Sequence, residues 1–80
     1  MGEDKYAYEL ERFGKRIKKL RLDRNLRQLD LEVETGIDRT DISKIENGLK
    51  NIEFFTMVRL SYAMDVTLEE LFNTPLSDED

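Results

Sequence analysis

Residues 28–48 read QLDLEVETGIDRTDISKIENG, a pattern that predicts two short helices joined by a tight turn. Gly36 stands where the chain must reverse direction, and glycine adopts the positive φ of such a turn at little steric cost. Asp38 is the predicted N-cap of the second helix, because a carboxylate can accept from backbone N–H groups two or three residues further on. We therefore expect the second helix to begin at about Arg39 and to end at Gly48.

The second helix of this pair has one apolar and one polar face. Ile42, Ile45 and Leu49 recur at intervals of three and four residues, which predicts one buried stripe. The polar side chains between them point to solvent; they are Arg39, Thr40, Ser43, Lys44 and Asn47. By its composition, this outward row is a predicted recognition surface.

A basic segment precedes the two helices. Residues 12–28 hold eight basic side chains and one acid, a local balance of +7, which leaves −12 for the rest of a chain whose net charge is −5. The local field rather than the total charge decides which partners approach a given face. The alternative for the basic segment is an ordinary solvated helix face.

A first helix is predicted over residues 6–25. Its apolar residues are spaced four, three, four and three apart, so they share one stripe: Tyr6, Leu10, Phe13, Ile17 and Leu20. Gly14 would let a neighbouring helix come close to it. Arg21 lies on or beside this stripe, as Glu46 does on the later helix, and pairing would satisfy both charges. The alternative is that both side chains reach solvent along their methylene groups.

The remaining segments also read as helices. L-D-L-E-V at residues 29–33 alternates like a strand, but the turn that follows it favours a helix. A fourth helix is predicted over Phe54 to Met64, and a T-x-x-E capping box at Thr67 and Glu70 predicts a fifth that ends by Asn73. The predicted inner face of the fourth helix is Phe54, Met57 or Val58, Leu60 or Ser61, and Met64.

Length and composition exclude several classes of protein. Eighty residues predict a single domain over 1–80, with a core of about residues 6–73 and an acidic tail at 74–80. The chain has no cysteine and no histidine, so we expect no disulfide, no metal site, no cofactor and no histidine-based catalysis. Apolar runs are too short for a membrane span and no signal peptide is recognisable, so a cytoplasmic protein is expected. Because no catalytic constellation is recognisable, we expect no enzymatic activity. We expect no small-molecule ligand.

The chain resembles the Cro/C1-type helix-turn-helix family of phage repressors and small bacterial regulators, also called the xenobiotic-response-element family. The resemblance covers roughly Phe13 to Phe72 and includes the closing V-T-L-E-E-L-F. The other matching residues are Arg21, Leu26, Gln28, Leu31, Gly36, Ile42, Ile45, Glu46, Gly48 and Asn51. Each match is weak by itself, and together at this spacing they are specific.

This resemblance implies a fold and a function. The fold would be an all-α, compact five-helix bundle, and the function transcriptional regulation, as a repressor or controller, through double-stranded operator DNA. With the later helix in the major groove, Arg39, Thr40, Ser43 and Lys44 would contact bases. Phosphates would be contacted by Gln28, Asn47, Lys50 and Asn51.

Family members bind operators as two-fold homodimers, since one helix reads only a few base pairs. The interface is expected among apolar residues near the C-terminus: Val66, Leu68, Leu71, Phe72 and Leu76. The resemblance also implies an Arg21–Glu46 ion pair, because the matching residues pair in lambdoid repressors. The short single-domain length is similar to that of restriction-modification controller proteins and also to that of phage regulators, and the sequence does not separate the two.

Two departures keep a second function open. The family has a serine or threonine cap where this chain has Arg27, and a small residue, most often alanine, where it has Glu32. Glu32 would have to lean outward or push the two helices apart, and it adds an acid near the DNA-facing side. The alternative function is a protein-interaction module on the same scaffold, such as an antitoxin, with weak or no DNA binding.

Overall fold

The computed structural model describes the backbone of residues 2–77 and the side chains of residues 5–77. Within that range the chain forms five helices and no strand, which confirms the predicted all-α fold. The helices are α1 (Gly2–Asp23), α2 (Gln28–Thr35), α3 (Arg39–Glu46), α4 (Phe54–Met64) and α5 (Leu68–Asn73). The last three residues of the predicted acidic tail lie outside the described part of the chain.

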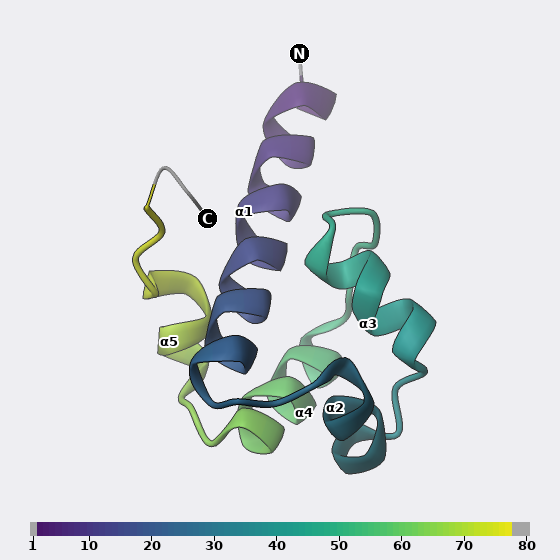
Figure 1. The fold of residues 1–80 in the computed structure, drawn as a ribbon. Helices are drawn as coiled ribbons and strands as arrows, with labels where there is room; N and C mark the ends of the chain where they lie inside the picture. The colour runs from purple at the N-terminus through teal and green to yellow at the C-terminus, as the bar shows by residue number, and fades with distance from the viewer. Residues whose placement is uncertain (1, 78–80) are drawn as a thin grey trace.

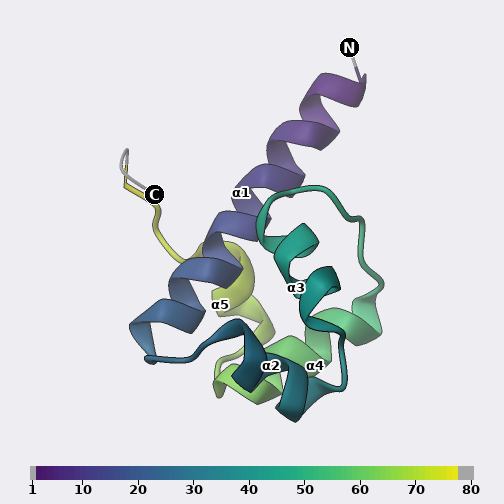
Figure 2. The same cartoon turned by 45° about the vertical axis from the view of Figure 1, so that its right-hand side comes forward.

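The long helix α1 organises the bundle. It packs against α3 on one side and α5 on the other, while α2 and α4 close one end (Figure 1). Its first turns project beyond the other helices (Figure 2), so Tyr6, which we expected on the buried stripe, is 71% exposed. The helix ends two residues earlier than predicted because Asn25 adopts a left-handed conformation (φ 58°) and turns the chain toward α2.

One core is shared by all five helices. Its fully or nearly fully buried apolar residues are Ile17, Leu20, Leu31, Ile42, Ile45, Leu60, Met64, Val66 and Leu71. Gly14 lies where α1 crosses α3, and a Cβ there would stand only 2.3 Å from the carbonyl oxygen of Ile45. The predicted close approach of a neighbouring helix at Gly14 is therefore confirmed, and its partner is α3.

Besides Tyr6, two apolar residues that we predicted to be buried are exposed. Leu49 is 73% exposed, because α3 ends at Glu46 and the left-handed Gly48 (φ 73°) turns the chain away from the helix axis. Phe54 is 67% exposed, because the buried face of α4 begins one turn later, at Met57. The predicted bounds of α4 and the start of α5 are confirmed, and Thr67 and Glu70 form the predicted capping box.

None of the helices within residues 2–77 combines the length and the hydropathy that a bilayer span requires.

Candidate nucleic-acid interface

Hydrogen bonds to residues of α2 and α4 hold the turn between α2 and α3. Gly36 is in the left-handed region (φ 76°), and its N–H donates to the carbonyl of Glu32 at 2.8 Å. The hydroxyl of Thr35 donates to the Leu31 carbonyl and accepts from the Ile37 N–H. From α4, the guanidinium of Arg59 donates to the Thr35 carbonyl. These contacts fix the angle at which α3 leaves the turn.

A buried ion pair joins α1 to the end of α3. Arg21 Nε and Nη2 donate to the two carboxylate oxygens of Glu46 at 2.7 and 3.0 Å, and the residues are 7% and 5% exposed. Arg21 Nη1 also donates to the carbonyl of Leu26 at 2.9 Å. The geometry is the two-pronged arrangement in which guanidinium and carboxylate interact most strongly.

Gln28 extends this network to the first residue of α2. Its side-chain nitrogen donates to Glu46 Oε1 at 3.1 Å. An amide nitrogen carries two hydrogens, so this bond leaves a second N–H for another acceptor. The residue predicted to anchor a phosphate is thus oriented by the same carboxylate that holds Arg21.

Six of the eight residues predicted to contact DNA line one depression. Arg39, Thr40, Lys44 and Asn47 are exposed there, whereas Ser43 is half-buried. Asn47 is further held by its side-chain N–H, which donates to the Ser43 carbonyl at 3.0 Å. The lining residues are Gln28, Arg39, Thr40, Ser43, Lys44, Asn47 and, unexpectedly, Leu49. Sequence reasoning missed Leu49 because it extended the buried stripe of α3 past Gly48.

Lys50 and Asn51 lie in a different depression, which they share with Asp38, Asp41 and Glu53. Lys50 Nζ is 3.6 Å from Asp41 Oδ1. The carboxylate of Asp41, in the first turn of α3, therefore lies beside Lys50. Lys50 and Asn51 therefore lie apart from the other six residues that we predicted to contact DNA, which line the depression on α3.

Asp38 is the N-cap residue of α3 and the helix begins at Arg39, as predicted, but the predicted capping bond is wrong. Asp38 makes no side-chain capping bond. The Arg39 N–H instead donates to the carboxylate of Glu32, whose Oε2 lies 3.1 Å away. Glu32 is half-buried and bonds to α3, so it neither leans away from α3 nor leaves its carboxylate unused. The one signal for this role in the sequence was the unusual size of Glu32 at that position.

The start of α2 also departs from the family pattern, at the N-cap residue. Arg27 occupies the N-cap position, where its N–H donates to the Asp30 carboxylate at 2.7 Å. The Arg27 guanidinium also bonds to Asp30, and this contact, together with the backbone bond, holds the pKa of that carboxyl below its usual range. Asp30 therefore accepts from the N–H of the N-cap residue, as the acid of a capping box does.

The basic face of α1 adjoins the depression on α3. Lys15, Lys18 and Lys19 line a groove between the two helices that reaches Glu46 and Asn47. Lys15 lies 3.7 Å from Glu11 on its own helix. The carboxylates of Glu11 and Asp23 line the same groove, and Asn47 belongs to both hollows, so the lysines and acids of α1 adjoin the face of α3.

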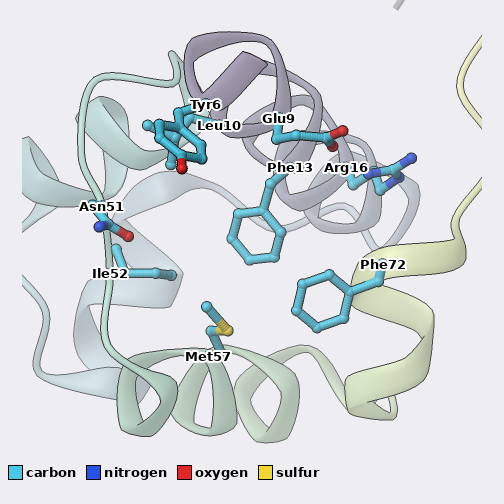
Figure 3. Close-up of a pocket in the computed structure, with 9 residues that line it drawn as sticks. All are labelled: Tyr6, Glu9, Leu10, Phe13, Arg16, Asn51, Ile52, Met57 and Phe72. Atoms are coloured by element: carbon cyan, nitrogen blue, oxygen red, sulfur yellow. The ribbon is translucent and has the colours of Figure 1, made fainter. Parts of the chain in front are cut away.

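Two residues of the predicted dimer interface are unavailable. Val66 is 8% exposed and Leu71 is fully buried, because both complete the core of the monomer. Leu68 and Leu76 are half-buried, and Phe72 remains 48% exposed. The Phe72 ring packs against that of Phe13, with their centroids 5.4 Å apart, at the edge of a largely apolar pocket (Figure 3).

Comparisons with known proteins agree with this geometry. Residues 14–77 match the family described as helix-turn-helix domain. The chain is similar to the control protein C.MunI of Mycoplasma sp, at 38% identity over 63 residues that cover 78% of this chain and 85% of the relative. It is similar to the control protein C.BamHI of Bacillus amyloliquefaciens, at 32% identity over 62 residues that cover 76% of each.

A solved structure has the same fold. The crystal structure of the restriction-modification controller protein C.AhdI from Aeromonas hydrophila has a TM-score of 0.79 and 32% identity to this chain. The alignment covers 81% of this chain and 98% of that one. With the family match and the bracing of α2 and α3, these likenesses show that the chain belongs to the Cro/C1-type helix-turn-helix family of DNA-binding regulators.

Proposed function

We propose that the protein is a cytoplasmic transcriptional regulator of the restriction-modification controller kind, which binds a pseudo-palindromic operator as a homodimer. The observation that carries the proposal is the single face that combines the polar side of α3 with Gln28 of α2. The opposite side of α3 is buried through Ile42 and Ile45, so only the polar side can meet a ligand. An exposed helix of this kind fits the major groove of B-DNA.

Base contacts come from the first two turns of α3. Arg39 offers two parallel donors to guanine O6 and N7, and Lys44 donates to the same atoms. Thr40 presents its methyl group to thymine, and Ser43 can donate or accept. Arg39, Thr40 and Lys44 are exposed, which leaves them room to meet base edges.

Phosphate contacts flank this reading surface. Gln28 would use its second N–H, and Asn47 stands at the other end of α3. Lys50 and Asn51 would reach the adjacent backbone from the loop after α3, and Lys50 must leave Asp41 to do so. These contacts set the register of the protein on the duplex without selecting bases.

Two-fold symmetry would place two copies of α3 in successive major grooves. Half-sites would then lie about one turn, roughly 34–36 Å, apart. Leu68, Phe72 and Leu76 are the parts of the predicted interface that are not enclosed in the core. The exposed edge of Phe72 and the adjoining apolar pocket supply a surface on which a second copy would pack (Figure 3).

The alternative, a protein-interaction module such as an antitoxin, is less well supported. It rested on Glu32 and on the charge of −12 outside residues 12–28. The Glu32 carboxylate bonds to the start of α3, and this contact gives the side chain a role in positioning that helix. Basic residues also gather around the DNA-facing side of the molecule, on α1 and α3.

The test is selection of DNA by the purified protein from a random-sequence duplex library, followed by gel-shift titration of the selected site. We expect a pseudo-palindromic site and a loss of selectivity in Arg39→Ala and Lys44→Ala. Failure to enrich any sequence would reject the proposal. Equal affinity and selectivity of both variants and the parent would remove α3 as the reading element.

A further inference from the structure

Glu32 connects the two helices of the motif on both sides of the turn. Its backbone carbonyl accepts from the Gly36 N–H at 2.8 Å, which terminates α2. Its carboxylate accepts from the Arg39 N–H at 3.1 Å, which begins α3. One residue of α2 therefore holds the last turn of its own helix and the first residue of the next.

The carboxylate of Glu32 supplies a hydrogen-bond acceptor that the start of α3 lacks. The first N–H groups of a helix have no partner within that helix. Asp38 occupies the N-cap position but makes no side-chain capping bond. The acceptor comes from the neighbouring helix instead, so the direction in which α3 begins depends on where α2 places Glu32.

The same carboxylate places a negative charge at the N-terminus of α3. The N-terminus of a helix has a positive partial charge, which attracts anions. Under the proposed function, DNA approaches the face on which Arg39 is exposed. A carboxylate bonded to the backbone of Arg39 would weaken that approach for every DNA sequence, because phosphate repulsion does not depend on the base.

We propose that Glu32 is a positioning residue with two separable effects on DNA binding, an inference that rests on the proposed function. Its hydrogen bond orients α3 and therefore the Arg39 side chain, which determines base preference. Its charge lowers the affinity for operator and unrelated DNA alike. The protein thus binds DNA more weakly than its reading surface allows, and it keeps the ratio between operator and unrelated DNA.

Two substitutions separate these effects. Glu32→Gln removes the charge and keeps a side-chain oxygen that can accept from the Arg39 N–H. Glu32→Ala removes both. Glu34→Gln is the matched control, since it makes the same charge change on α2 at an exposed residue that points away from Glu32, two positions along the helix.

We expect Glu32→Gln to tighten binding to operator and to unrelated DNA by about two- to fivefold at low salt, with the ratio unchanged. Glu34→Gln should tighten binding less. Glu32→Ala should lower the preference for the base read by Arg39 by about three- to tenfold, because a helix cap is typically worth about 1 kcal/mol and its loss frees the start of α3. Affinities are measured by fluorescence anisotropy at several salt concentrations.

A measurement without DNA tests the contact itself. The Arg39 amide should keep its protection from hydrogen exchange in Glu32→Gln and lose it in Glu32→Ala, as read by NMR. Protection retained in Glu32→Ala, with base preference unchanged, would overturn the positioning role. A Glu32→Gln variant that gains no more affinity than Glu34→Gln would overturn the effect of charge.

Different results would overturn the proposed function and the role of Glu32. A parent chain that enriches no DNA sequence overturns the proposed function, and the role of Glu32 in DNA binding with it. A parent that selects an operator, while all three variants bind as it does, overturns only the role of Glu32.

Discussion

The residues that hold α3 are charged, and they are stable in the interior only as a set. Glu46 accepts two bonds from Arg21 and one from Gln28, so its carboxylate is surrounded by donors. Charges removed from water lose hydration, and the loss is offset only while every partner is present. This network is therefore more valuable for the placement of α3 than as a source of net stability.

We expect Glu46→Gln to destabilise the domain by roughly 3–5 kcal/mol, because it leaves the Arg21 charge buried without an anionic partner. The double substitution Arg21→Met with Glu46→Leu should cost much less, since it removes both charges. Thermal and urea unfolding of the two variants measure the difference. A Glu46→Gln variant that melts within a degree or two of the parent would contradict the role of the pair.

A base contact and a phosphate contact fail differently, and Arg39 tests the first. Loss of its fork of donors in Arg39→Ala should cost about 1–3 kcal/mol on the selected operator. The penalty should vanish when the base pair opposite Arg39 is changed. Competition gel shifts against single-position operator variants provide the measurement. A uniform loss across all variants would assign Arg39 to the phosphate backbone instead.

Lys50 tests the second kind of contact. Lys50→Ala should weaken binding to all sequences alike and flatten the salt dependence by about one unit for each phosphate that the lysine neutralises in the parent. Asp41→Asn is the complementary change, since it removes the carboxylate 3.6 Å from Lys50 and should strengthen binding. Salt titrations of both variants are compared with the parent. An unchanged slope in Lys50→Ala would place Lys50 away from the DNA.

At the scale of elements, the helix boundaries depend on carboxylates. Asp30 at the start of α2 and Glu70 at the start of α5 each accept from the backbone N–H three residues earlier. The pKa of Asp30 is lowered by Arg27, and that of Glu70 by the Thr67 N–H. A lowered pKa in the folded state means that the ionised form stabilises the fold. This contribution is present above the ordinary pKa and is lost as pH falls through the folded value.

The pH dependence of unfolding should therefore change in Glu70→Gln. We expect this variant to melt below the parent at pH 7, with the gap closing as the pH falls through the lowered pKa of Glu70 in the folded state, where the parent carboxyl becomes protonated. Thermal melts followed by circular dichroism between pH 7 and pH 3 measure the gap. Glu69→Gln, on the same helix but outside the capping box, is the control. A gap that persists unchanged at pH 3 would rule out Glu70 ionisation as the cause.

Local signals predicted the helices well, and tertiary contacts explain the errors. Thr67 with Glu70 and the glycine at position 36 act within a few residues, so the sequence alone locates those helix ends. Leu49 was misplaced because a left-handed residue before it breaks the helical period. The contact between Glu32 and Arg39 depends on the angle between two helices, which no residue spacing reports.

At the scale of the whole molecule, the core and any dimer interface draw on the same apolar residues. The sequence has a group of apolar residues near the C-terminus, among which we expected the dimer interface. It could not show which ones the monomer uses. Val66 and Leu71 are buried in this chain, whereas Phe72 is half exposed. The division between core and surface depends on how α5 rotates against α1, which is a property of the assembled bundle.

We expect sedimentation to show a homodimer at micromolar concentration, or dimer formation on operator DNA. Leu76→Glu should shift the equilibrium toward monomer, because it puts a charge into the proposed contact while leaving the helices intact. Tyr62→Glu introduces the same charge at an 81% exposed position of α4 and serves as the control. A parent chain that stays monomeric with and without DNA would contradict the dimer.

The glycine at the crossing of α1 and α3 has a kinetic consequence. The carbonyl oxygens of Ile45 and Glu46 lie where a Cβ of Gly14 would be, so the end of α3 packs directly on the backbone of α1, and we expect this contact to hold α3 in place. DNA then meets a surface that is already in its binding shape, and no slow rearrangement separates encounter from docking. The association rate should be set by diffusion and by electrostatic steering, and should fall steeply with added salt. Differences between operators would then appear in how long the complex lasts.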